Sequence, residues 1–283
     1  MIEPTPTGVS NLLARYDGVL LDVYGVLLDA VGPLPGAREL IAELDRRGMP
    51  FAIVTNDASR SSATYAARFA AHGMAIAAER FVTSGSLMPA YFRDHGLAGA
   101  RTCVLGPADS VAYVRAGGGV PIVLEAGMEL DALAICDDDG FDFLPAIEAA
   151  CSAVVRAVAA GRRPALVLPN PDLIYPKRDG ELGFTAGAIA LLIEAALARR
   201  FPSATIVFAR LGKPEPHLFL AASRLLGIAP ARLVMIGDQL ETDIAGARAA
   251  GIAPALLAGI SSWDHARATA TVAPDWLLDK LAP

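Results

Sequence analysis

The sequence predicts an α/β protein: a doubly wound parallel sheet with a second, smaller α/β domain inserted into it. Short apolar runs alternate with helical segments along most of the chain. This alternation is typical of parallel sheets with helices on both faces. Near Arg101 a second strand-helix alternation begins, and the first pattern resumes later. A domain inserted between two halves of another is the simplest interpretation.

The first part of the core begins with a buried strand at residues 18–22. Its apolar positions run into Asp22, and Gly25 opens a turn. An apolar run of this length bounded by glycine indicates a buried strand. A second buried strand, residues 51–55, ends in a polar turn that can cap a helix. The remaining elements expected here are helices at 37–47, 61–72 and 87–94 and a short strand at 81–84.

The inserted domain is expected at residues 86–183, between core segments 1–85 and 184–283. Its predicted elements are strands at 102–105, 122–125, 133–137 and 165–169 and a main helix at 145–159. The core then resumes with helices at 185–198, 216–226 and 242–250 and strands at 233–237 and 254–257.

Composition excludes several classes of protein. The chain has 283 residues, of which 54% are hydrophobic and 19% charged, so a sizeable core can form. A net charge of -6 and the lack of a basic run argue against nucleic-acid binding. No apolar stretch reaches the ~18 residues of a membrane helix. The three cysteines lack CxxC spacing, and the N-terminus does not resemble a signal peptide. We therefore expect a reduced, cytoplasmic protein.

Polar side chains at strand ends or in loops provide the candidate site. They are Asp22, Thr55 with Asn56, Lys213, and Asp238 with Asp243. The carboxyl ends of parallel strands meet in one crevice, so these groups could converge. An aspartate can act as a nucleophile, and two carboxylates can hold Mg²⁺. A hydroxyl, backbone N–H groups and a lysine can hold phosphoryl oxygens.

Each of these residues also has an ordinary structural explanation. Thr55 and Asn56 are consistent with a turn and a helix cap. Lys213 is consistent with a solvated loop, and Asp238 and Asp243 with a turn and a cap. The combination of all of them in this order is what favours a catalytic site.

The motifs LLDVYGV, IVTND, LGKPEP and GDQLETDIAGARAAG, in this order, resemble the haloacid dehalogenase superfamily. The position of the insert, between IVTND and LGKPEP, is similar to the class IIA branch, which carries an α/β cap. The likeness spans about residues 16–257 and implies a Rossmann-like core. It also implies a Mg²⁺-dependent phosphatase that acts on a small phosphorylated metabolite.

The resemblance assigns a role to each candidate. Asp22 would be the nucleophile and a metal ligand, together with the carbonyl of Tyr24 and with Asp238, while Asp243 would support the metal. Thr55, Asn56 and Lys213 would hold phosphate beside the Tyr24–Gly25 turn, and Lys213 would neutralise charge near Asp22.

One residue departs from the pattern of the phosphatases. They carry a second aspartate two residues after the nucleophile, and this chain has Tyr24. A tyrosine there is similar to the 2-haloacid dehalogenase branch, whose members need no Mg²⁺. The GDQLETD stretch and the inserted cap favour the phosphatase. A haloacid dehalogenase and a catalytically degenerate ligand-binding protein remain the alternatives.

Substrate choice is expected to reside in the inserted domain. Asn170 and Asp172 follow its last strand and are candidates for facing substrate, although an Asn-Pro-Asp turn without ligand contact explains them equally well. An apolar face of the insert could pair two copies into a homodimer. Neither a nucleic-acid nor a membrane partner is expected.

Overall fold

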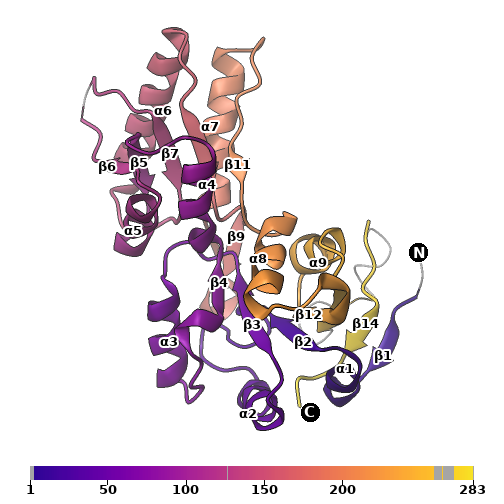
Figure 1. Ribbon diagram of the computed structural model, residues 1–283. Coiled ribbons are helices and arrows are strands. Elements are labelled where there is room, and N and C mark those ends of the chain that lie inside the picture. The colour runs from indigo at the N-terminus through magenta and orange to yellow at the C-terminus, as the bar shows by residue number, and fades with distance from the viewer. Residues whose placement is uncertain (1–2, 126, 258–262, 264–270, 283) are drawn as a thin grey trace. The chain divides into compact units, whose positions relative to one another are not determined.

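The computed structural model describes residues 3–125, 127–257, 263 and 271–282. The chain divides into two compact units. Unit 1 comprises Met1–Thr55, Ser62–Val82 and Lys213–Pro283, and unit 2 comprises Asn56–Ser61 and Thr83–Gly212. Each unit is built on its own sheet (Figure 1). Among the described residues, no helix is long and apolar enough to cross a membrane.

Unit 1 contains a seven-stranded sheet in the order β1-β14-β13-β12-β2-β3-β4. The pairings described for it are parallel. Its strands are β1 (Thr5–Thr7), β2 (Gly18–Leu21), β3 (Phe51–Thr55), β4 (Phe81–Thr83), β12 (Leu233–Gly237), β13 (Ala253–Leu257) and β14 (Trp276–Leu278). The predicted parallel α/β fold is therefore confirmed.

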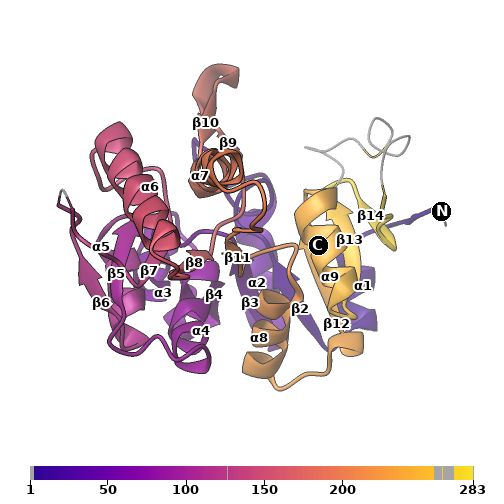
Figure 2. The same cartoon turned by 90° about the horizontal axis from the view of Figure 1, so that it is seen from above.

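Successive side chains of a strand point to opposite faces of the sheet, and here both sets are apolar. Helices therefore cover both faces of this sheet. One face of the sheet, which includes Val19, Leu21 and Ile53, packs into a buried cluster with three helices. These are α1 (Val9–Arg15), α2 (Ala37–Arg47) and α3 (Ser62–Ala71). Two further helices, α8 (Pro216–Leu226) and α9 (Ala245–Ala249), contact each other and the strands β3 and β13 respectively (Figure 2).

The order of the strands creates a switch point in unit 1. The chain runs from β2 outward through β3 to β4, and the last strands run outward from β12 in the opposite direction. β2 and β12 are hydrogen-bonded neighbours, with Leu21 paired to Ile236. Open α/β sheets form ligand sites at the carboxyl ends of the strands where the order reverses. The residues that follow β2 and β12 therefore occupy the expected position for a site.

Unit 2 has its own five-stranded sheet, in the order β11-β8-β7-β5-β6, with parallel pairing throughout. The strands are β5 (Arg101–Leu105), β6 (Val120–Ile122), β7 (Ala132–Ile135), β8 (Ala165–Leu168) and β11 (Ala209–Arg210). One face packs against α6 (Phe143–Ala159) and α7 (Ala186–Arg200). The other packs against α4 (Met88–Asp94) and α5 (Ala108–Ala116).

Helix α7 explains why the boundary of the insert differs from the one predicted at residues 183 and 184. Ile189, Ile193 and Leu197 of α7 lie in the same buried cluster as Leu133 and Leu166 of the unit 2 sheet. The division of the structure accordingly falls between Gly212 and Lys213. A helix with apolar residues suits either sheet, so the sequence pattern did not show which one α7 covers.

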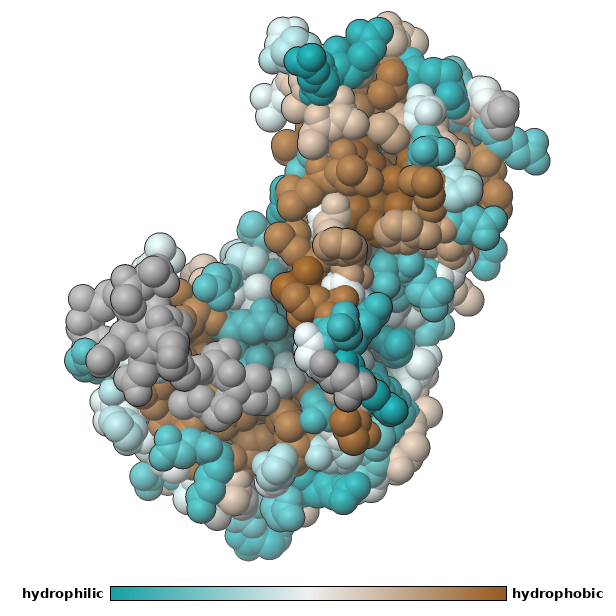
Figure 3. All heavy atoms as spheres, turned by 180° about the vertical axis from the view of Figure 1, so that it is seen from behind, coloured by the Kyte–Doolittle hydropathy of each residue, from teal (hydrophilic) through white to brown (hydrophobic). Residues whose placement is uncertain are grey.

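A two-stranded antiparallel hairpin in unit 2 was not predicted. It consists of β9 (Ile174–Pro176) and β10 (Leu182–Phe184). Phe184 lies opposite Ile174, and both are exposed, as is Leu182. Apolar side chains also gather on the face of unit 2 seen in Figure 3. A homodimer formed through such a surface stays a prediction.

Asp137, which follows β7 in unit 2, makes the stability of this unit depend on pH. Burial raises the pKa of the Asp137 carboxyl to about 6, and a hydrogen bond with Asp138 adds to the effect. Between the usual aspartate pKa of about 4 and this value, the folded state holds more protons than the unfolded chain. The stabilising contribution of the proton is therefore complete below pH ~4 and is lost as the pH rises through about 6.

We predict that Asp137→Asn stabilises the protein at pH 7.5 by about 1 kcal/mol, since it removes a partly buried charge. Thermal unfolding should show a gain of about 2–4 °C that shrinks toward pH 4.5. The exposed Asp139→Asn serves as control and should lack this pH-dependent gain. A gain for Asp137→Asn that is the same at both pH values would contradict the assignment.

Candidate active site

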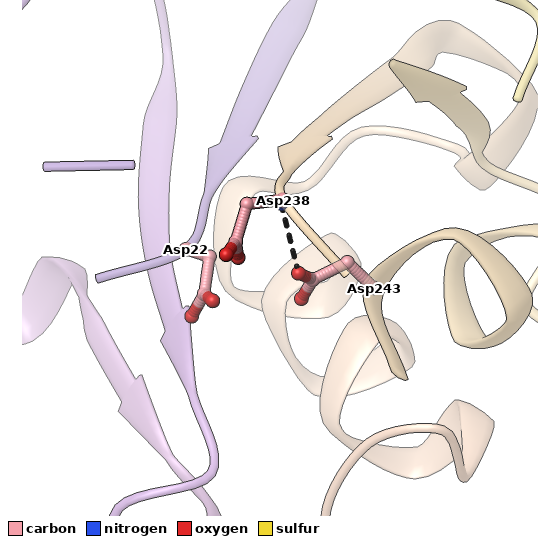
Figure 4. Close-up of side chains that lie close together, drawn as sticks. All are labelled: Asp22, Asp238 and Asp243. Carbon is pink, nitrogen blue, oxygen red and sulfur yellow. Dashed lines mark hydrogen bonds between the residues drawn. The ribbon is translucent and has the colours of Figure 1, made fainter. Parts of the chain in front are cut away.

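Asp22 and Asp238 lie side by side because the strands that carry them are neighbours. Asp22 directly follows β2 and Asp238 directly follows β12. The backbone N–H of Asp22 donates to the carbonyl of Ile236 at 3.1 Å, which ties the two strand ends together. Ligand atoms of Asp22, Asp238 and Asp243 lie within 4.8 Å of one another (Figure 4). Three residues that the sequence suggested for the site therefore meet in unit 1.

Asp243 reaches this cluster through a π-helical turn. Leu240–Ile244 form the turn, and the N–H of Ile244 donates to the carbonyl of Gln239. Insertions of this kind are frequent at functional sites. Oδ2 of Asp243 accepts from the N–H groups of Asp238 and Gln239, each at 3.2 Å. Asp243 thus holds the loop that carries Asp238. The two hydrogen bonds fix the orientation of the Asp243 carboxylate, which would not be needed if Asp243 only capped a helix.

Lys213 joins the carboxylates to one another. Its Nζ lies 2.7 Å from Oδ1 of Asp22 and 2.7 Å from Oδ1 of Asp243. Lys213 is only 3% exposed and Asp243 is 0% exposed, which excludes the solvated-loop explanation of Lys213. Ion pairs to such deeply buried groups are stable only when the geometry is good and hydrogen bonds satisfy the remaining polar atoms.

The buried charges shift one another's protonation. Burial raises the pKa of Asp22 to about 7, with repulsion from Asp243 adding to this and Lys213 opposing it. Burial also raises the pKa of Asp238, to about 8, with repulsion from Asp243 and Asp22. For Lys213, burial alone would lower the pKa, but the carboxylates of Asp22 and Asp243 raise it above its usual value. Three ionised carboxylates would outnumber the one ammonium group, and the raised pKa values of Asp22 and Asp238 express this imbalance as a tendency to take up protons.

The cluster has the features of a site for a small divalent cation. Oδ1 of Asp238 is buried and has no hydrogen-bond partner among the described residues. Gly25 (φ +84) leaves room for this carboxylate, because a Cβ there would lie 2.1 Å from Oδ2 of Asp238. Mg²⁺ prefers carboxylate oxygens and usually keeps several waters. The donor set, its excess charge and the unpaired oxygen all fit such an ion.

Thr55 and Asn56 lie at the end of β3, which pairs with β2. Both side chains are buried. Thr55 is the last residue of the first segment of unit 1, and Asn56 begins the segment grouped with unit 2. Nδ2 of Asn56 donates to Oδ1 of Asp172 at 2.8 Å. The turn after β3 is therefore fixed by the loop that follows β8.

Asn170 makes local contacts in unit 2. Its Oδ1 accepts from the N–H of Asp172 at 3.0 Å, and its Nδ2 donates to Oγ1 of Thr185 at 3.2 Å. The first of these contacts forms an Asx-type turn, which was the alternative explanation of Asn170 and Asp172. Contact of either residue with substrate stays a prediction.

Tyr24 has a partner that the sequence analysis did not identify. The guanidinium of Arg68, on α3, donates a hydrogen bond to the phenol oxygen of Tyr24. Both side chains are half-buried. Arg68 lies 44 residues from Tyr24 in the chain. Nothing in the helical pattern of α3 distinguishes it from a surface arginine, so no sequence signal could have revealed the pair.

Sequence comparison identifies the family. Residues 19–119 match the family described as haloacid dehalogenase-like hydrolases, and residues 210–283 match a related hydrolase family. The chain is 31% identical to mouse (Mus musculus) chronophin over 274 residues, covering 92% of this chain and 87% of the relative. The chain belongs to the haloacid dehalogenase-like hydrolases. It is an enzyme, and the resemblance read from its motifs is confirmed.

Other relatives carry phosphatase names. Glycerol-3-phosphate phosphatase from Gallus gallus is 30% identical, with 96% of this chain and 91% of the relative covered. A solved structure from Cytophaga hutchinsonii, described as a possible sugar phosphatase, superimposes with a TM-score of 0.86 at 27% identity and 99% coverage of both chains. The 4-nitrophenylphosphatase of Thermotoga maritima, at 22% identity and a TM-score of 0.79 with 96% and 97% covered, shares the fold.

We predict that Gly25→Ala destabilises unit 1 by about 1–3 kcal/mol, because its positive φ is strained for alanine and its Cβ overlaps Asp238. Urea unfolding measures the loss. Gly32→Ala is the control, since a Cβ there meets nothing within 4 Å. Equal stability of the two variants would show that Gly25 has no steric role.

Proposed function

We propose that this hydrolase is a Mg²⁺-dependent phosphatase that cleaves a small phosphorylated metabolite through an aspartyl-phosphate. The observation that carries the proposal is the buried cluster of Asp22, Asp238 and Asp243 around Lys213. The names of the relatives supply the substrate class, since glycerol-3-phosphate and dihydroxyacetone phosphatases are among them.

The proposed metal site consists of Asp22, Asp238 and the backbone carbonyl of Tyr24, with Asp243 supporting it. When bound, Mg²⁺ would supply positive charge to the phosphoryl oxygens and to the Asp22 carboxylate. The π-turn residue Asp243 would keep the Asp238 loop in place through its two N–H contacts. The raised pKa values of Asp22 and Asp238 indicate why protons would compete with the ion at low pH.

Asp22 would perform the covalent step. A carboxylate oxygen of Asp22 would attack phosphorus while the bond from phosphorus to the ester oxygen breaks, and this oxygen would leave with the electron pair and take up a proton from solvent to give the alcohol. A water molecule would then attack the phosphorus of the acyl-phosphate and give up a proton to solvent, while the bond from phosphorus to the Asp22 oxygen breaks, which releases phosphate and restores the carboxylate. Lys213, 2.7 Å from Asp22, would hold phosphoryl oxygens and offset their charge.

Thr55 and the N–H of Asn56 are proposed to hold the remaining phosphoryl oxygens. The position of Thr55 supports this role, since it is buried at the end of β3, the strand that pairs with β2. Substrate choice is proposed to reside in the long segment of unit 2, Thr83–Gly212, with Asn170 and Asp172 as candidates.

We predict that Asp22→Asn abolishes phosphate release, because an amide cannot form the acyl-phosphate. The loss should exceed about 10³-fold in kcat. The assay is colorimetric phosphate release from a panel of phosphate monoesters, with Mg²⁺ and with chelator. The exposed Asp94→Asn serves as control. Full turnover by Asp22→Asn would refute the mechanism, and binding without turnover on any ester would indicate a ligand-binding protein.

Tyr24 favours a second candidate, a 2-haloacid dehalogenase, because a halide leaves without needing a proton. In that reaction Asp22 would displace halide from carbon, and water would hydrolyse the resulting ester. Metal-independent release of chloride from 2-chloro acids, with no phosphatase activity, would establish this alternative.

We predict that Tyr24 makes turnover depend steeply on the leaving group. A phenol is a poor base for activating water. Proton transfer by a well-matched general acid or base raises the rate of a reaction by roughly 10²–10⁴-fold. Aryl phosphates should therefore be cleaved far faster than alkyl phosphates. Tyr24→Asp should raise kcat for alkyl esters more than for aryl esters. Rapid alkyl hydrolysis by the native protein, without a selective gain in Tyr24→Asp, would show that another group supplies the proton.

A further inference from the structure

The Tyr24–Arg68 pair occupies the position at which this chain departs from the phosphatase pattern. Tyr24 lies two residues after Asp22, and the intervening Val23 is fully buried in the main cluster of unit 1. The chain bends and turns after β2, and Gly25, the residue after Tyr24, comes so close to Asp238 that a Cβ there would lie 2.1 Å from its Oδ2. Tyr24 therefore lies in the chain between the nucleophile and the turn that meets the carboxylate cluster.

The contacts of the phenol hold it in one place. Its ring packs against the main apolar cluster of unit 1, to which Tyr65 and Phe69 of α3 also belong. Arg68, on the same helix, donates from Nη1 to the phenol oxygen, and its guanidinium carbon lies 5.3 Å from the ring centroid. The ring and the oxygen of Tyr24 thus both have partners on α3.

The arginine side chain can donate hydrogen bonds but cannot accept one, and this fixes the direction of the hydrogen bond between Arg68 and the phenol. Because Arg68 occupies a lone pair of the oxygen, the O–H of Tyr24 cannot be directed at Arg68. No acceptor for this O–H is present among the described residues. The half-buried hydroxyl therefore keeps a hydrogen atom available for a ligand, and a donated bond from a cation strengthens it as a donor.

We propose that Arg68 is a positioning residue that fixes the phenol of Tyr24 as a hydrogen-bond donor to the ester oxygen leaving phosphorus. The inference rests on the proposed phosphatase function. No proton changes place in this contact: the phenol O–H stabilises the negative charge that develops on the oxygen as its bond to phosphorus breaks. The pair thereby replaces part of the help that an aspartate gives in other phosphatases.

A double-mutant cycle on Tyr24 and Arg68 tests the proposal. The variants are Tyr24→Phe, Arg68→Met and the double variant, all assayed in Mg²⁺ with an alkyl and an aryl phosphate. A hydrogen bond of ordinary strength corresponds to about tenfold in rate. We expect each single variant to lower kcat for the alkyl ester about tenfold, with little change in KM and little effect on the aryl ester. The double variant should be no slower than Tyr24→Phe.

The controls separate positioning from a structural effect. Arg68→Lys keeps a charged donor and should recover part of the alkyl activity, whereas Arg115→Met, at an exposed position of α5, should leave activity unchanged. Thermal unfolding checks that each variant is folded. Arg68→Lys keeps the test valid if Arg68→Met fails to fold, because its leaving-group dependence can be compared with that of the native protein.

The outcomes distinguish the two proposals. If the native protein releases phosphate but Arg68→Met affects alkyl and aryl esters equally, or slows Tyr24→Phe further, Arg68 does not act through the phenol and the inference is wrong. If no phosphate monoester is hydrolysed by the native protein or by Tyr24→Asp, the proposed function itself fails. Selective and non-additive loss on alkyl esters supports both.

Discussion

Burial of three carboxylates around one ammonium group is the constraint on which the site depends. Asp22, Asp238 and Asp243 lie within 4.8 Å of one another with Lys213 bonded to two of them. Charges so close repel strongly when water is excluded, and one lysine does not balance three aspartates. The raised pKa values of Asp22 and Asp238 express this imbalance. Such an arrangement is unfavourable by itself and suits a partner that brings positive charge.

Apolar packing of the unit 1 sheet offsets the unfavourable free energy of holding these charges close together. β2 and β12 are buried on both faces and paired in register, so the positions of Asp22 and Asp238 follow from apolar packing. The segments around them are less regular: Gly25 has a positive φ, and Leu240–Ile244 form a π-turn. Irregular backbone of this kind is expected where a site has to aim side chains that regular structure would direct elsewhere.

Tyr24 places a phenol two residues after Asp22, where the motif resemblance leads us to expect a second aspartate. The phenol is hydrogen-bonded to Arg68. A phenol donates a hydrogen bond readily but accepts a proton poorly at neutral pH. In the proposed phosphatase reaction, departure of the alcohol and attack by water would therefore receive unequal help.

The sequence by itself determined the fold class, the central strands and the four groups that meet in unit 1. It could do so because buried parallel strands appear as continuous apolar runs, and because Asp22 and Asp238 follow two of them. Only the tertiary structure decided that α7 packs in unit 2, that the β9–β10 hairpin forms, and that Arg68 reaches Tyr24. Apolar periodicity shows that a helix has a buried face but not which sheet covers it. Likewise, a contact across 44 residues depends on how α3 packs, which no local pattern of residues specifies.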